Sequence, residues 1–155
     1  MNKDSLIFIT GHRGLLGSNL LNFLKNKGYS NILVASRDQL DLLNQNDVEI
    51  FLKSHQPEYI IHCAAKAGGI MGNKASPYDF IYNNLQIQNN IINTSYASGV
   101  KKLLFVSSTC VYPKNCPQPM KETDILSSKF TKDLQPYCLA KVAGAEMLEA
   151  LYSQF

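Results

Sequence analysis

A tyrosine and a lysine four residues apart, Tyr137 and Lys141, form a YxxxK sequence near the C-terminal end of the chain. Side chains spaced by four residues share one face of a helix. An ammonium group beside a phenol stabilises the phenolate, which lowers the tyrosine pKa from about 10 toward neutral pH. The spacing therefore predicts that Tyr137 is a general acid or base. The alternative is a solvated helix face, because the pattern is short.

More reactive side chains lie earlier in the chain, in the sequence Ser107-Ser108-Thr109-Cys110. This segment follows the apolar run Leu103–Val106, which predicts a buried strand. Ligands bind at the carboxyl ends of strands in open parallel sheets. A hydroxyl there can hydrogen-bond a substrate carbonyl beside the tyrosine. Cys110 reaches the same place, unless it is a small buried hydrophobic residue.

A glycine-rich segment, Gly11-His12-Arg13-Gly14-Leu15-Leu16-Gly17, separates a predicted strand, Leu6–Thr10, from a predicted helix, Leu15–Lys27. Glycine allows a tight turn and lets backbone amides approach a pyrophosphate, while the helix N-terminus favours its charge. The spacing is GxxGxxG, and the strand-turn-helix context strengthens it. We predict that this turn binds a dinucleotide; the alternative is a structural turn.

Two arginines indicate which dinucleotide. The second predicted strand, Ile32–Ala35, is followed by Ser36 and Arg37, and Arg13 lies inside the glycine turn. Guanidinium groups bind phosphates in a forked geometry, which suits the 2′-phosphate of NADP. We therefore expect NADP rather than NAD. The alternative is that Arg37 is a solvated surface charge and that Asp38 binds the ribose hydroxyls, as an acid does in NAD enzymes.

The elements that must position these groups alternate between short apolar runs and helical segments. Further strands are expected at Tyr59–Cys63 and, as a short one, at Arg37–Leu42; further helices are expected over Asp47–His55, Asp79–Ser98 and from about Pro136 to the end, with an irregular loop over Tyr112–Gln135. Such alternation predicts an α/β fold, a Rossmann-like parallel sheet with helices on both faces. We treat residues 1–155 as one incomplete NADP-binding domain.

Composition excludes several function classes. The chain has 155 residues, 45% of them hydrophobic, a net charge of +3 and no basic stripe, so nucleic acid is not an expected partner. No apolar stretch has membrane length, and no Cys/His group has zinc-ligand spacing, so neither a membrane nor a metal is expected. The four cysteines, Cys63, Cys110, Cys116 and Cys138, form no CxxC pair. Reduced thiols in the cytoplasm are the simplest interpretation.

Seven stretches resemble the extended short-chain dehydrogenase/reductase superfamily and, within it, the GDP-L-fucose synthases. They are Gly11–Gly17, Ser36–Leu42, Ala64–Ile70 (AAKAGGI), Phe80–Asn84 (FIYNN), Ser107–Lys114 (SSTCVYPK), Gln118–Glu122 and Tyr137–Lys141. AAKAGGI and SSTCVYPK are far more specific than the glycines. The resemblance implies an NADPH-dependent epimerase/reductase that converts GDP-4-keto-6-deoxy-D-mannose to GDP-L-fucose.

The resemblance also implies site residues. Ser108, Tyr137 and Lys141 match the catalytic serine, the tyrosine acid and the lysine that binds the nicotinamide ribose, and Cys110 matches one half of an acid/base pair for epimerisation. The segments matching cofactor-binding ones contribute Gly11, Arg13, Gly14, Leu15, Gly17, Arg37, Asp41, Leu42, Ala64, Ala65 and Lys141. The three side chains of Ser108, Tyr137 and Lys141 are expected to converge on a nicotinamide held by the glycine turn.

The same resemblance implies that the chain is an N-terminal half. The family's second acid/base residue is a histidine beyond the YxxxK helix, and His12, His55 and His62 match no catalytic position. We expect the last strands and the C-terminal substrate domain to be absent, and the fragment to be inactive alone. A homodimer through helices near 79–98 and 136–153 is possible in the family. Two alternatives stay open: another nucleotide-sugar 4-ketoreductase or epimerase, and a non-catalytic NADP-binding module.

Overall fold

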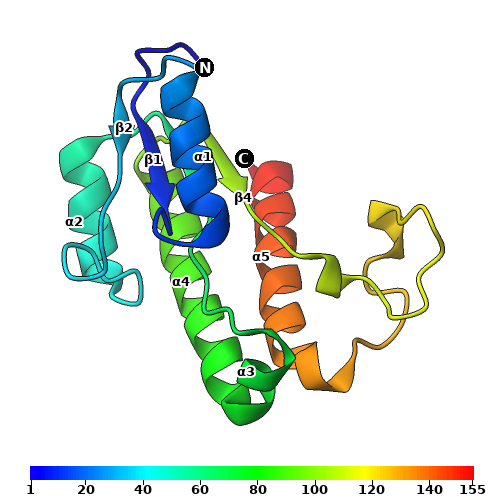
Figure 1. The fold of residues 1–155 in the computed structure, drawn as a ribbon. Coiled ribbons are helices and arrows are strands. Elements are labelled where there is room, and N and C mark those ends of the chain that lie inside the picture. Colours follow the sequence, from blue (N-terminus) through cyan, green and yellow to red (C-terminus); the bar gives the residue numbers. More distant parts are fainter. The chain divides into compact units, whose positions relative to one another are not determined.

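The structure is a computed structural model that describes every residue from Met1 to Phe155. The chain divides into two compact units, and each consists of two stretches of sequence. Unit 1 comprises residues 1–65 and 86–106, and unit 2 comprises residues 66–85 and 107–155. One helix, α4 (Pro77–Ala97), contributes residues to both units. The element labels are those of Figure 1.

Unit 1 contains a four-stranded parallel sheet in the order β2-β1-β3-β4. Its elements are β1 (Ile7–Thr10), α1 (Leu15–Asn26), β2 (Ile32–Leu33), α2 (Gln45–His55), β3 (Tyr59–His62), β4 (Lys102–Phe105) and the C-terminal part of α4 (Figure 1). All neighbouring strands run the same way, as crossover helices require. The predicted Rossmann-like α/β fold is confirmed.

The two faces of this sheet bury alternate residues of β1. Ile7 and Ile9 pack with Leu24 of α1 on one face. Phe8 packs on the other face in a cluster whose buried members are Leu40, Val48, Leu52, Ile60 and Ile91. Side chains alternate across a strand, so one continuous apolar run feeds two cores. Because β1 is buried on both faces, its position in the sheet is fixed, and so is the point at which the glycine turn begins.

One predicted strand is wrong. Arg37–Leu42 forms no strand and instead belongs to the loop between β2 and α2. The Gln39 side-chain oxygen accepts hydrogen bonds from the Ser36 backbone amide at 2.9 Å and from its hydroxyl at 2.8 Å. The Gln39 amide in turn donates to the Ser36 carbonyl at 3.0 Å. These local bonds close a turn, which competes with extended pairing.

Helix α2 begins two residues before the predicted start at Asp47. The side chain of Asn44 caps it, accepting hydrogen bonds from the amides of Asn46 and Asp47 at 3.0 and 3.4 Å. Asparagine is a preferred N-cap, because its oxygen satisfies amides that have no partner within the helix. The prediction placed the start at the first acidic residue rather than at this cap.

Unit 2 consists of helices around a long irregular segment. It contains α3 (Gly69–Ala75), the first part of α4, three 3-10 turns, Thr109–Val111, Glu122–Asp124 and Lys132–Leu134, and α5 (Gln135–Gln154). Pro136 lies in the first turn of α5, where a missing amide hydrogen costs nothing. Helix α3 was not predicted, since its two glycines disfavour helices.

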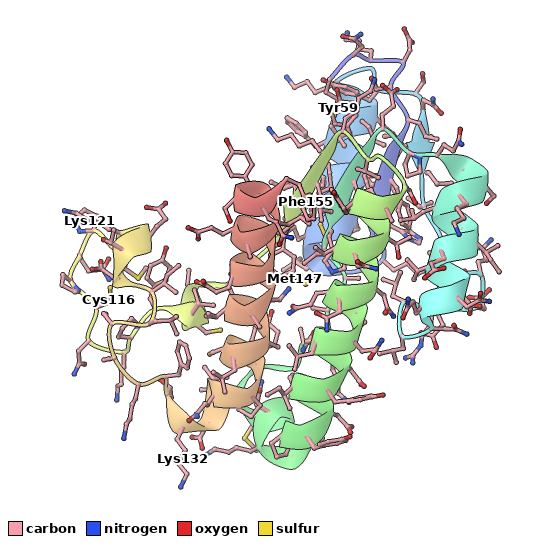
Figure 2. The ribbon with its side chains drawn as sticks, turned by 180° about the vertical axis from the view of Figure 1, so that it is seen from behind. Tyr59, Cys116, Lys121, Lys132, Met147 and Phe155 are labelled. Carbon is pink, nitrogen blue, oxygen red and sulfur yellow. The ribbon has the colours of Figure 1, made fainter.

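The irregular segment is organised in part by Asp124. Its carboxylate accepts hydrogen bonds from the Lys121 amide at 2.9 Å and from the Cys116 thiol at 3.5 Å (Figure 2 labels both partners). Burial and the Asp124 carboxylate raise the pKa of the Cys116 thiol. All four cysteines are free thiols. None of the helices combines the length and the apolar character needed to cross a bilayer.

Two residues on α2 test the core of unit 1. Leu52→Ala should lower the free energy of unfolding by about 2–5 kcal/mol, because the fully buried side chain leaves a cavity. Ile50→Ala, at a position that is 59% exposed on the same helix, should change it by less than about 0.5 kcal/mol. Urea unfolding followed by far-UV circular dichroism measures both. Equal losses at the two positions would contradict the assignment of this core.

Candidate active site

The glycine turn leaves no room for side chains at two positions. Gly11 has a φ of +68°, and a Cβ atom there would lie 2.8 Å from the Ala64 backbone nitrogen. A Cβ atom on Gly17 would overlap the Gly11 carbonyl oxygen. Gly14 is the N-cap of α1, and its amide donates to the Gly11 carbonyl at 2.9 Å. The turn thus presents bare backbone at a helix N-terminus, which suits a phosphate group.

Ala64 is held against this turn by a hydrogen-bond chain between neighbouring strands. The Ala64 amide donates to the Thr10 hydroxyl oxygen at 3.1 Å, and that oxygen lies 2.8 Å from Nδ1 of His62. Thr10 ends β1 and His62 ends β3, so the bonds fasten the carboxyl ends of both strands. Gly11, Gly14, Gly17 and the adjoining Ala64 and Ala65 therefore belong to one end of the unit 1 sheet.

Each of the two predicted arginines lies near a carboxylate of the loop after β2. The pKa of Asp38 is lowered, first by a hydrogen bond from Ser36, then by its own backbone amide, with a smaller contribution from the charge of Arg13. Arg37 adjoins Asp38 in sequence and contacts Asp41 only loosely, with 4.0 Å between Nε and the carboxylate oxygen. Its side chain is 79% exposed. Arg37 can therefore turn toward a ligand at little cost.

Two further predicted cofactor residues of this loop, Asp41 and Leu42, are held by hydrogen bonds. Asp41 accepts a hydrogen bond from the Leu43 amide at 3.1 Å, which fixes its carboxylate. The Leu42 carbonyl accepts one from the Asn90 side chain at 2.8 Å, which ties the loop to α4. Leu15, the first residue of α1, is 88% exposed, so it presents an apolar side chain at the mouth of the glycine turn.

In unit 2 a pocket of about 220 Å³ brings together three of the predicted catalytic residues. Ser108, Cys110 and Tyr137 line it, with Ala67, Gly68, Gly69, Asn73, Phe80 and Leu134. Ser108 and Cys110 lie at the 3-10 turn that follows β4 in the chain, and Tyr137 lies in the first turn of α5. Ser107 is exposed and does not line the pocket. Ser108 is therefore the serine that the geometry favours.

Two contacts orient the tyrosine. The Phe80 ring meets the Tyr137 ring edge to face, with centroids 6.4 Å apart and an interplanar angle of 74°. Lys141 follows one helical turn later, and its Nζ lies 6.0 Å from the centroid of the Tyr137 ring. Lys141 is only 4% exposed. Lys141 is thus buried and Tyr137 half-buried in the pocket wall, so the alternative of a solvated helix face is wrong.

Cys110 is electrostatically unusual. A hydrogen bond from the Cys138 thiol is the largest influence on its pKa, which falls to about 6; Ser108, the backbone and the charge of Lys141 act in the same direction against burial. The same interaction raises the pKa of Cys138, which stays a protonated donor. Cys110 is therefore mostly thiolate at neutral pH, the form that accepts a proton or attacks as a nucleophile.

The expected lowering of the Tyr137 pKa is not found. Burial, the dominant effect, raises that pKa, and electrostatic interactions with Cys110 and then Cys138 add to it. The phenolate would lie in an apolar wall near a thiolate, so the phenol keeps its proton. The pocket thus holds one group that readily accepts a proton and one that retains it. Groups whose pKa values are pushed apart are typical of an acid and a base in one site.

Sequence reasoning missed several lining residues. Asn73 and Leu134 carried no motif. Cys138, which does not line the pocket but acts on Cys110, was assigned no role although it lies inside YxxxK. Gly68, Gly69 and Phe80 belong to the AAKAGGI and FIYNN stretches, so the resemblance marked their segments without giving them roles. Only burial and contacts distinguish these residues from their neighbours.

Known proteins resemble this chain closely. GDP-L-fucose synthase 1 from Arabidopsis thaliana is 44% identical over 149 residues, which cover 96% of this chain and 46% of that protein. The GDP-L-fucose synthase of Escherichia coli K12 is 39% identical over 149 residues, with the same coverage of 96% and 46%. The resemblance to GDP-L-fucose synthases is therefore confirmed. The chain spans about half the length of the curated relatives it matches.

A solved structure gives the same picture. MlghC, a GDP-mannoheptose C4 reductase from Campylobacter jejuni solved with NADP bound, superposes with a TM-score of 0.96 at 39% identity, over 100% of this chain and 46% of MlghC. The pattern of the NAD dependent epimerase/dehydratase family matches residues 7–155. With the glycine turn of unit 1 and the serine, cysteine and tyrosine of unit 2 in their expected segments, the chain belongs to the NAD dependent epimerase/dehydratase family.

Proposed function

We propose that these residues form the NADPH-binding and proton-transfer part of an enzyme that converts GDP-4-keto-6-deoxy-D-mannose to GDP-L-fucose. The observation that carries the proposal is the single pocket lined by Ser108, Cys110 and Tyr137, in which the acid and the base are both present. Relatives named GDP-L-fucose synthase support the substrate class.

The reduction needs a proton donor at the C4 carbonyl oxygen, and Tyr137 supplies it. NADPH, when bound, provides the hydride. The high pKa of the buried phenol keeps the proton available until the oxygen becomes an alkoxide. The Ser108 hydroxyl lines the same pocket and can donate to the C4 oxygen once it releases its hydrogen bond to Cys110. Lys141 places a positive charge behind the phenol.

The epimerisation needs a base for the C–H bonds beside the ketone, and Cys110 fits this role. Carbons 3 and 5 flank the C4 carbonyl, so their protons leave to form an enolate. The Cys110 thiolate accepts such a proton and becomes a neutral thiol. Reprotonation on the opposite face inverts the carbon, and the resemblance assigns that step to a histidine beyond the YxxxK helix.

The glycine turn fits a dinucleotide, and the arginines favour NADP. The bare backbone at Gly11 and Gly17 makes room for a pyrophosphate at the α1 N-terminus. Arg13 and Arg37 would hold the 2′-phosphate, while Asp38, whose pKa is lowered, would oppose it. The positive charges of these two arginines favour NADP, and the relative MlghC was solved with NADP bound. The proposed cytoplasmic location and homodimer remain predictions.

A second candidate is a GDP-sugar C4 reductase that does not epimerise, because one solved relative carries that name. Both reactions use Tyr137 and Ser108, and only epimerisation uses the thiolate. The lowered pKa of Cys110 favours the epimerase/reductase. A non-catalytic NADP-binding module has no need of either proton-transfer group.

The first prediction separates these activities in the natural protein that contains these residues. Tyr137→Phe should lower NADPH oxidation with GDP-4-keto-6-deoxy-D-mannose by about 100-fold or more, because the proton donor is removed. Cys110→Ala should abolish exchange of the C3 and C5 protons for deuterium while NADPH binding is retained. Absorbance at about 340 nm follows NADPH oxidation, and NMR of the sugar follows the exchange of its protons. Normal exchange in Cys110→Ala would exclude this thiol as the base.

The second prediction concerns cofactor choice. Arg37→Ala should weaken NADPH binding by about 10- to 100-fold and leave NADH binding nearly unchanged, because a charge-assisted phosphate contact is lost. Lys53→Ala, an exposed cation on α2, is the matched control and should change neither affinity. Titration of cofactor fluorescence gives both dissociation constants. Equal NADPH and NADH affinities in the unmodified protein would refute the arginine argument.

The third prediction follows from the thiol pair. Alkylation of Cys110 by iodoacetamide should rise with pH around a midpoint of about 6, because only the thiolate reacts. Cys138→Ala removes the hydrogen-bond donor and should move the midpoint upward, toward about 8.5. Cys116, whose pKa is raised, is an internal control and should react only at higher pH. Peptide mass spectrometry follows each cysteine; an unshifted midpoint in Cys138→Ala would contradict the pairing.

A further inference from the structure

Asn73 is a polar residue in the pocket wall that the chemistry described so far does not use. It belongs to α3, lines the pocket with Ser108, Cys110 and Tyr137, and is only 2% exposed. The remaining lining residues, Ala67, Gly68, Gly69, Phe80 and Leu134, offer no polar side chain. Asn73 is therefore the one amide side chain that faces the reacting groups.

The nitrogen and the oxygen of the Asn73 amide differ in their hydrogen bonding. Its Nδ2 donates a hydrogen bond to the Gly69 carbonyl at 2.9 Å, whereas its buried Oδ1 has no hydrogen-bond partner. The bond to a carbonyl fixes which end is nitrogen, because two oxygens would repel. Leaving a buried acceptor unsatisfied costs about 1–3 kcal/mol, so such atoms are rare in native proteins. This one needs a donor that the chain does not supply.

A second buried asparagine in the same unit shows what a purely structural amide looks like. Asn84 is also 2% exposed but does not line the pocket. Its Oδ1 accepts from the Lys66 amide at 2.8 Å, and its Nδ2 donates to the carbonyls of Lys66 and Phe80 at 3.0 and 2.7 Å. Every polar atom of Asn84 is satisfied within the protein. Of the two buried asparagines in unit 2, Asn73 alone keeps an oxygen without a hydrogen-bond partner.

We propose that Oδ1 of Asn73 accepts a hydrogen bond from a hydroxyl group of the substrate sugar and so selects a hydroxylated ring. This inference rests on the proposed function and names a specificity residue for it. An amide oxygen can only accept, and the ring of a 4-keto-6-deoxyhexose offers O–H donors only at C2 and C3. A nucleotide sugar that lacks the contacted hydroxyl would bury the oxygen without a partner. Sites built to bind a hydroxyl reject such analogues strongly.

The test compares GDP-4-keto-6-deoxy-D-mannose with its 2-deoxy and 3-deoxy analogues in the protein as it is expressed. The unmodified protein should lose about 10-fold or more in kcat/KM with one analogue, as expected for one buried hydrogen bond. Asn73→Leu should lower kcat/KM for the parent sugar by a similar factor, chiefly through KM, and should no longer distinguish that analogue.

Three controls separate recognition from structure. Asn89→Leu makes the same chemical change at an exposed position on α4 and should alter nothing. The dissociation constant of NADPH should be unchanged in Asn73→Leu, since the nicotinamide amide group is the other donor that could reach this oxygen. Thermal unfolding by circular dichroism reports folding. If Asn73→Leu does not fold, the unmodified protein with the three sugars still decides the question.

The remaining outcomes overturn the inference in distinguishable ways. Equal kcat/KM for all three sugars in the unmodified protein would refute it while leaving the proposed function standing. A uniform loss across the three sugars in Asn73→Leu would show a structural role, and weakened NADPH binding would assign the oxygen to the cofactor. No NADPH oxidation with any of the sugars by the natural protein that contains these residues would refute the proposed function and this inference with it.

Discussion

The close approach of two backbones governs unit 1. Gly11 and Ala64 lie so near each other that a Cβ on Gly11 would meet the neighbouring main chain at 2.8 Å. The Thr10 hydroxyl connects the same two strand ends, through the Ala64 amide and His62. The side chains of β1 pack into a core on each face of the sheet, which fixes the position of this strand. The packing of the core therefore imposes the contact between Gly11 and Ala64. The backbone proposed to bind phosphate is thus already arranged by the packing of the core.

In unit 2, the thiol of Cys138 has the largest influence on the pKa of Cys110. One sulfur group donates to another, and the pair separates into a base and a donor that stays neutral. The pKa of Tyr137 in the same pocket wall is raised, because burial and the thiolate both disfavour its ionised form. The pocket therefore divides proton acceptance and proton donation between Cys110 and Tyr137. The proposed epimerisation and reduction at one ketone would use this division.

Much of this could be predicted from hydrophobic pattern. Apolar runs predicted β1, β3 and β4 within about two residues, because buried parallel strands are continuously apolar. Helix α3 and the turn at Ser36 could not be predicted, since they depend on local bonds within glycine-rich or polar sequence. The direction of the Tyr137 pKa and the environment of Asn73 depend on burial, which no local pattern reveals.

The three glycines of the turn differ in how well they would tolerate an added side chain. Gly14 has an ordinary negative φ of −77°, and an added methyl would lie 3.3 Å from the Gly11 carbonyl oxygen, a contact that a small shift relieves. Gly17 would collide with that same oxygen, and Gly11 with the neighbouring strand end. Evolutionary drift in this turn would therefore reach the middle glycine first. A descendant sequence reading GxxAxxG would still fold the same turn.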